Sequence, residues 1–167
     1  SYFIEVEGRP ISSVGFEIDE NNGSVIIGGM LCGAEDNYVN AGFCLTLDNQ
    51  LELVKETIVE FDESFISSTW SPETIERQKK EKEKDKDGKS PEMFGYKIDH
   101  ILIRPDGSFV TLAEQYQSIT MTTGSQGMTS SITTYFYGNI IAIGFDPAGN
   151  FLWKTIVEKD QVTSDDR

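Results

Sequence analysis

Apolar and polar residues alternate along most of this chain, and short glycine-containing turns interrupt them, a pattern that predicts β-strands. Residues 14–27 (VGFEIDENNGSVII) match residues 98–111 (IDHILIRPDGSFVT) at a constant offset of 84, which pairs Phe16 with His100. In both copies two apolar runs flank an Asn-Gly or Asp-Gly turn, whose residues adopt positive φ at little cost. Each copy is therefore predicted to be a β-hairpin.

A second hairpin repeats further along the chain, at an offset of 98. Residues 43–48 (FCLTLD) match residues 141–146 (IAIGFD), and a turn and another apolar strand follow each segment. One face of the strand carries large residues, and the opposite face carries small or modest ones, as expected where another sheet layer approaches closely. These smaller residues are Cys44 and Thr46 in the first copy and Ala142 and Gly144 in the second.

The two hairpins of each copy predict a unit of four sequential antiparallel strands, and hence an all-β fold with two repeats in a single domain, residues 1–167. The first repeat covers residues 11–61 and the second covers residues 98–158. Residues 62–97 between them form a charged helical insertion, and residues 159–167 form a tail.

One helix is predicted, and it lies in the charged insertion. Ser71 is suited to the N-cap and Pro72 to the first turn, and the charged stretch continues to Lys86 before Gly88 ends it. Few apolar residues follow Ile75, so we expect the later turns to be solvated.

The second repeat differs from the first by fourteen extra residues between its second and third strands, the difference between offsets 98 and 84. These residues fall in the segment 116–137, which is rich in Thr, Ser and β-branched residues around a glycine turn. Strand propensity on both sides of the turn predicts one long protruding hairpin arm. The arm is either simply solvated or binds a partner through its apolar side chains. These candidate interaction residues are Met121, Met128, Tyr135, Phe136 and Tyr137.

The net charge of −14 excludes some classes of partner. Residues 71–90 hold 7 basic and 6 acidic side chains, which leaves 7 basic and 22 acidic ones elsewhere, a charge of −15. Such a body repels phosphate backbones, so we expect no nucleic-acid partner. No apolar run approaches the roughly 18 residues of a membrane span, so we expect no membrane insertion.

Two cysteines, Cys32 and Cys44, lie on either side of a loop. They are interpreted as small buried residues, with a disulfide between facing strands as the alternative. Two thiols without clustered histidines do not complete a zinc shell.

Residues 140–154 (IIAIGFDPAGNFLWK) resemble the third-to-fourth-strand hairpin of quinoprotein-type propeller blades. Together with residues 104–116 (RPDGSFVTLAEQY) they also resemble repeats of exported bacterial cell-envelope proteins. The resemblance implies blade-like repeats but carries over no cofactor-holding residue, so no cofactor is expected. Because two blades cannot close a propeller, three arrangements remain open. The chain belongs to a longer protein, identical subunits form a ring, or the strands form a β-sandwich or open barrel.

Catalytic and metal-binding patterns are weak in this sequence. His100 aligns with an apolar strand face and is predicted to be a core or semi-buried residue. Residues 83–88 only superficially resemble the start of a calcium loop, because lysines alternate with the acids. Glu114 at a strand end is interpreted as a solvated side chain, with a glycosidase acid as the alternative. The protein is therefore predicted not to be an enzyme.

We expect a protein-interaction or scaffolding module of an exported bacterial protein, located in the periplasm or on the cell surface. The alternative is a carbohydrate-binding or carbohydrate-processing domain, in which Trp70 and Trp153 would stack on sugar rings. The expected partner is accordingly a protein or a glycan.

Overall fold

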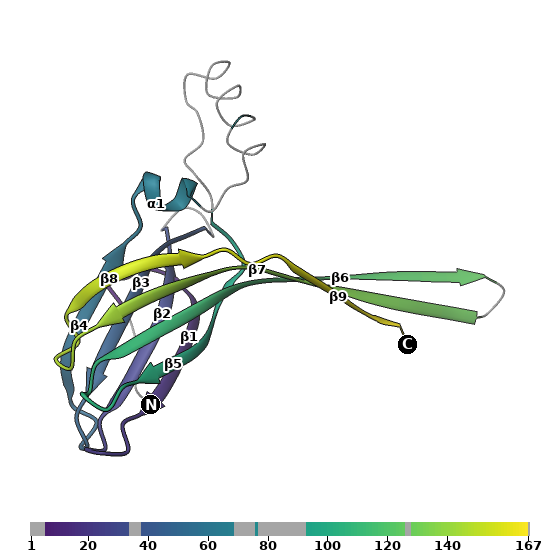
Figure 1. The fold of residues 1–167 in the computed structure, drawn as a ribbon. Helices are drawn as coiled ribbons and strands as arrows, with labels where there is room; N and C mark the ends of the chain where they lie inside the picture. The colour runs from purple at the N-terminus through teal and green to yellow at the C-terminus, as the bar shows by residue number, and fades with distance from the viewer. Residues whose placement is uncertain (1–5, 34–37, 69–75, 77–92, 126–127, 167) are drawn as a thin grey trace.

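The computed structural model describes residues 6–33, 38–68, 76, 93–125 and 128–166, and these residues form nine strands and one short helix (Figure 1). The strands make two antiparallel sheets, which confirms the all-β prediction with two units. The elements are β1 (Ile11–Ile18), β2 (Val25–Cys32), β3 (Val39–Leu47), β4 (Leu53–Glu60), α1 (Glu63–Ser67), β5 (Tyr96–Ile103), β6 (Phe109–Ser125), β7 (Met128–Phe145), β8 (Phe151–Val157) and β9 (Gln161–Asp166).

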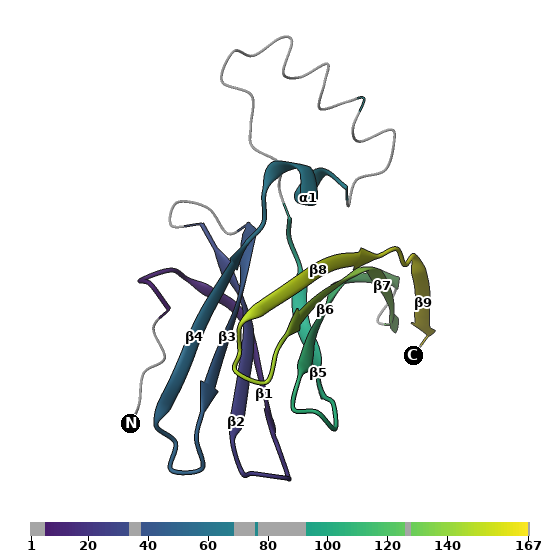
Figure 2. The ribbon, with the colours of Figure 1, turned by 60° about the vertical axis from the view of Figure 1, so that its left-hand side comes forward.

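Each sheet keeps its strands in sequence order. Sheet one runs β1-β2-β3-β4, and sheet two runs β5-β6-β7-β8, with β9 pairing the arm part of β7. Figure 2 shows the two sheets as separate layers that face each other, and the described strands do not close into a barrel.

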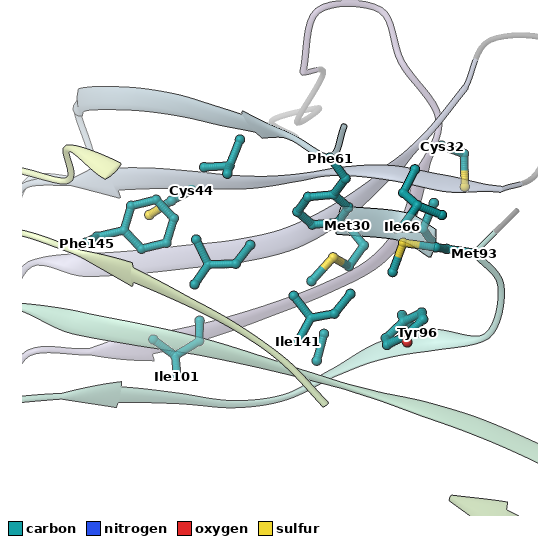
Figure 3. Close-up of a cluster of buried hydrophobic side chains, with 14 of the residues drawn as sticks. Met30, Cys32, Cys44, Phe61, Ile66, Met93, Tyr96, Ile101, Ile141 and Phe145 are labelled. Atoms are coloured by element: carbon teal, nitrogen blue, oxygen red, sulfur yellow. The ribbon is translucent and has the colours of Figure 1, made fainter. Parts of the chain in front are cut away.

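One buried cluster lies between the sheets and joins them (Figure 3). Met30 and Cys44 from sheet one meet Ile101, Ile141 and Phe145 from sheet two in this cluster. Burial of this apolar surface is the main force holding the layers together.

Hydrogen bonds join the sheets at both edges of this core. The backbone N–H of Ile98 donates to the hydroxyl of Ser13, and on the other side Thr57 donates to the carbonyl of Gly149. Lys154 also donates to the carbonyl of Glu60.

The two units match strand by strand, and the pairing register defines two corresponding faces in each. We call the face that carries Phe43, Leu45 and Leu47 in sheet one, and Ile141, Ile143 and Phe145 in sheet two, the front face; the opposite face is the back face. The front face of sheet two packs on the back face of sheet one.

Glycines on the back face of sheet one make this close packing possible. Side chains of sheet two lie directly over these positions: Ile98 over Gly15, Thr111 over Gly28 and Ile143 over Gly42. A close sheet layer was predicted on this side of β3 and is confirmed there. In sheet two the equivalent small residues, Ala142 and Gly144, lie on the outside, where the ring of Trp153 covers Gly144.

The prediction that His100 is a core or semi-buried residue is wrong, because its side chain is exposed. The β5–β6 turn is one residue shorter than the β1–β2 turn, and a bulge between Ile98 and His100 shifts the register back. The structural equivalent of Phe16 is therefore Ile101, whereas His100 occupies the position of Gly15 on the back face.

The cysteines do not face each other, because Cys32 pairs with Val39 and Cys44 with Gly28. Both thiols are free and buried, which confirms their interpretation as small buried residues. Burial raises the pKa of the Cys44 thiol to about 12.

Two further elements were not predicted. The helix α1 begins after Asp62, whose carboxylate caps it by accepting from the N–H of Phe65, and its residue Ile66 joins the core. The tail contributes β9, which lies beside the arm. The helix predicted from Ser71 to Lys86 lies outside the described residues, apart from Glu76.

Candidate functional site

The front face of sheet one is an apolar surface that no other described strand covers. Its middle row runs Phe16, Ile27, Leu45 and Glu56 across the four strands, and Phe16 is 69% exposed. Val14, Ile18 and Leu53 on the same face are also exposed. In sheet two the equivalents of Val14, Phe16 and Ile18 are buried or half-buried against sheet one, so the exposure of these three residues is specific to the first unit. The equivalent of Leu53, Phe151, is exposed in the second unit as well.

The N-terminal segment covers one end of this face. Val6 is fully buried against Leu31, Ala41 and Phe43, and a tight turn follows it. Arg9 then fastens the segment, because its guanidinium pairs with Glu60 and donates to the amide oxygen of Asn40. The open part of the face is therefore its other end, near the hairpin turns.

The back face of sheet two is the second surface left open. Leu102, Val110, Gly144 and Trp153 form one row across its strands, and Trp153 is 38% exposed. The next row contains His100, Leu112, Ala142 and Thr155. The face is mainly apolar at its centre, with the exposed imidazole of His100 at one side, 3.5 Å from the Asp99 carboxylate.

The predicted arm projects from one side of the two sheets as a long two-stranded hairpin (Figure 1). Its strands pair from Tyr116 with Tyr137 out to Ser125 with Met128. One side of the hairpin, which we call the arm stripe, carries exposed apolar side chains, and Met121 is 69% exposed. The arm stripe consists of Ile119, Met121, Ile132, Phe136 and, from β9, Val162.

The opposite side of the arm carries tyrosines and threonines. Tyr116 packs against Tyr135 and Tyr137, with ring centroids 6.4 Å and 5.4 Å apart. Lys97 and Lys159 place their ammonium groups over the rings of Tyr116 and Tyr137, which fixes the base of the arm to the body. The five predicted arm residues are thus divided: Met121 and Phe136 lie on the stripe, and Tyr135 and Tyr137 on the other side. Met128 begins β7, and its side chain is not described.

A cleft of about 480 Å³ lies between the first hairpin turns of the two units. Glu17, Asp19, Glu20 and Arg104 supply its charged lining, and apolar residues of β5 complete it. Trp153 does not line this cleft, and Trp70 lies outside the described residues. The carbohydrate alternative therefore gains no convergent tryptophan and carboxylates in the part of the chain that the structure describes.

Other candidate groups are held in local contacts. Glu114 forms an ion pair with Lys159 at the base of the arm, which is not the solvated position predicted. The calcium-like residues 83–88 lie outside the described part. Within the described ranges, no three His, Cys, Asp or Glu side chains gather as metal ligands. No described helix is long and apolar enough to cross a membrane.

Sequence reasoning identified the arm but missed the two open faces. The alternating pattern shows that Val14, Phe16 and Ile18 share one face, but an apolar strand face is normally assigned to the core. The signal that could have reversed this assignment is the row of glycines on the opposite face, at positions 15, 28 and 42.

Comparison with protein-family models, with curated proteins and with solved structures found no match to this chain.

Proposed function

We propose that this chain is a non-enzymatic protein-interaction or scaffolding module of an exported bacterial protein, and that the arm is its partner-binding element. The observation that carries the proposal is the arm stripe. Ile119, Met121 and Ile132 lie side by side on one surface of the hairpin, and exposed apolar groups are unfavourable in water. A hairpin that only contacts solvent would be expected to carry polar residues at these positions.

The charge distribution supports this role for the arm. No charged residue occurs between positions 116 and 137, although the whole chain carries −14. The two arm strands carry no charge, although β9 brings Asp166 into register with Ile132 at one edge of the stripe. Such a stripe is recognised mainly by apolar contact and strand pairing rather than by ion pairs. The arm therefore suits a protein surface that itself has an apolar patch.

We also propose that the two units are blade-like repeats of the propeller type. Their sequential antiparallel strand order, their shared register and their face-to-face packing support this view. No specific observation in the described residues favours the carbohydrate alternative.

Site-specific photocrosslinking in the producing cell tests the role of the arm. A photoreactive residue replaces Met121 on the stripe or, as the matched control, exposed Thr122 on the opposite side of the same strand. We expect a discrete protein adduct from position 121 and none from position 122. Ile119→Thr combined with Ile132→Thr should abolish the adduct while far-UV circular dichroism stays unchanged. Equal adducts from both positions, or none, would contradict the proposal.

A further inference from the structure

We propose that copies of this chain associate head to tail, with the front face of sheet one in one copy packed on the back face of sheet two in the next. This contact uses neither side of the arm, so it is independent of the function proposed above. The partner is a second copy of the same chain, and the interface within one molecule is its template.

The template is the packing of sheet two on sheet one. There, a front face lies on a back face: Ile98 over Gly15, Thr111 over Gly28 and Ile143 over Gly42. The molecule thus shows that a front face of this repeated unit packs on a back face that carries glycines. After this contact is made, each chain is left with one open front face and one open back face.

Both open faces have the character of an interface. Val14, Phe16 and Ile18 are exposed on the front face of sheet one, and Leu102 and Trp153 on the back face of sheet two. Exposed apolar patches of this kind mark interaction sites in soluble proteins, and aromatic residues are enriched at interface centres. Superimposing the units by register places Phe16 of one copy against Leu112 of the next.

Few charged residues stand on the two faces. Glu56 stands on the front face of sheet one, where Glu60 is already paired with Arg9. Lys97 stands on the back face of sheet two, where Glu114 is already paired with Lys159. A chain of net charge −14 repels its own copies elsewhere, so these two mainly apolar faces are surfaces on which copies can meet.

Leu51 is a second sign of an interface at this end of the front face. A leucine is unfavourable there, because the backbone has positive φ and the apolar side chain is exposed to water. Its φ is +66° and its side chain is 65% exposed, whereas glycine occupies the equivalent position 149. Backbone strain of this kind is often retained where it serves a function. Leu51 lies in the turn beside the open end of the front face, next to Leu53, where a second copy would cover it.

The contact between copies differs from the template in one respect. His100, Leu112 and Ile140 occupy the back-face positions that Gly15, Gly28 and Gly42 occupy in sheet one. The two copies therefore cannot approach as closely as the two sheets of one molecule. We expect a reversible association rather than a permanent one, and its head-to-tail geometry produces a ring or an open chain of copies.

Mixing two complementary variants tests the proposal. Phe16→Glu blocks the front face of sheet one, and Leu112→Glu blocks the back face of sheet two. Analytical ultracentrifugation should show concentration-dependent association of the wild type, and a monomer for each variant alone. An equimolar mixture should form a 1:1 heterodimer, because each variant keeps the face that the other lacks. Such rescue does not occur if two identical faces meet about a two-fold axis.

Two controls keep the outcome interpretable. Met121→Glu in the arm should leave self-association unchanged. His100→Glu, at an exposed position, blocks the back face should Leu112→Glu fail to fold. A wild type that stays monomeric at about 1 mM, a concentration that detects even millimolar dissociation constants, overturns the proposal. Association of the wild type without rescue in the mixture overturns it as well.

Discussion

Asp48 and Asp146 organise equivalent turns in the two units. The carboxylate of each accepts from the backbone N–H groups two and four residues later. The residue three positions after each aspartate has positive φ: Leu51 in the first unit and Gly149 in the second. The same side-chain geometry therefore builds both turns, but only the second has the residue that its backbone prefers.

Replacing Leu51 with glycine should stabilise the isolated monomer by about 0.5–1 kcal/mol, because the left-handed strain of a non-glycine residue is relieved. Urea unfolding at low protein concentration measures the change. Gly149→Leu is the matched control, and we expect it to destabilise the fold, since an added Cβ meets Thr46 and Lys55 at 3.2–3.3 Å. Equal effects of the two substitutions would contradict this explanation.

Asp146 should make stability depend on pH in the acid range. Hydrogen bonds from the Asn150 side chain, and from the Asn150 and Ala148 backbone, lower its pKa below the usual 3.8. A lowered folded-state pKa contributes stability that is present above the unfolded value and lost as pH falls through the folded one. Asp146→Asn should therefore be less stable than wild type at pH 7, and the difference in unfolding free energy should start to shrink as pH falls below about 4. Urea unfolding midpoints from pH 7 to pH 2.5 measure this, and a constant difference would exclude it.

At the scale of strands and sheets, the glycines of the back face decide which layers meet. An added Cβ at Gly28 would lie 2.7 Å from the Thr111 methyl group and 3.3 Å from Ile101. Both neighbours are buried, so they have little room to move.

Gly28→Val should lower the free energy of unfolding by about 1–3 kcal/mol through overpacking, despite the better strand propensity of valine. His100→Val serves as the control on the open back face and should change stability by less than about 0.5 kcal/mol. Thermal unfolding of both variants provides the measurement. A neutral Gly28→Val variant would show that the sheets are not tightly packed there.

Much of this architecture could be predicted from the chain. Period-two alternation, the turn residues and the two offsets located eight strands and the arm, because these features act locally. The strand β9 could not be found in the same way, since its residues (QVTSDD) are mostly polar and pair only with the arm. The environment of His100 was missed because turn length and a bulge, rather than composition, set the register of β5.

The candidate sites were harder to predict than the strands. The alternation of apolar and polar residues shows which residues share a strand face, but it does not show which face is buried. In sheet one, large residues such as Phe16 are exposed, while Gly28 and Cys44 face the second sheet. Which face of sheet one is buried depends on a contact between segments that are more than eighty residues apart in the sequence. In the sequence, the small residues of this face, above all its glycines, carry information about that contact.

At the scale of the whole molecule, two repeats meet through one of the two possible front-to-back contacts. The remaining front and back faces lie on opposite outer sides of the pair. Whether copies use them depends on the balance between apolar attraction and the repulsion of chains that each carry −14.

Raising the ionic strength from about 0.02 M to about 0.5 M should therefore strengthen self-association. Salt screens the charge repulsion, and the contact between the faces is mainly apolar. Sedimentation at several salt concentrations measures the dissociation constant. A dissociation constant that rises with salt would indicate instead that ion pairs hold the copies together.

The arm continues β6 and β7 outward without disturbing the strands that flank them. The pairs between Phe109 and Phe145, and between Ala113 and Ile141, match those of the first unit, so the added residues leave the strand pairing of the body unchanged. Removing two residues from each arm strand would shorten the hairpin by about 6.6 Å and keep the remaining cross-strand pairs and their sides. Beyond Ile132, where the pairing with β9 ends, the length of the arm can thus vary during evolution, or be adjusted by design, without changing the strand pairing of the rest of the protein.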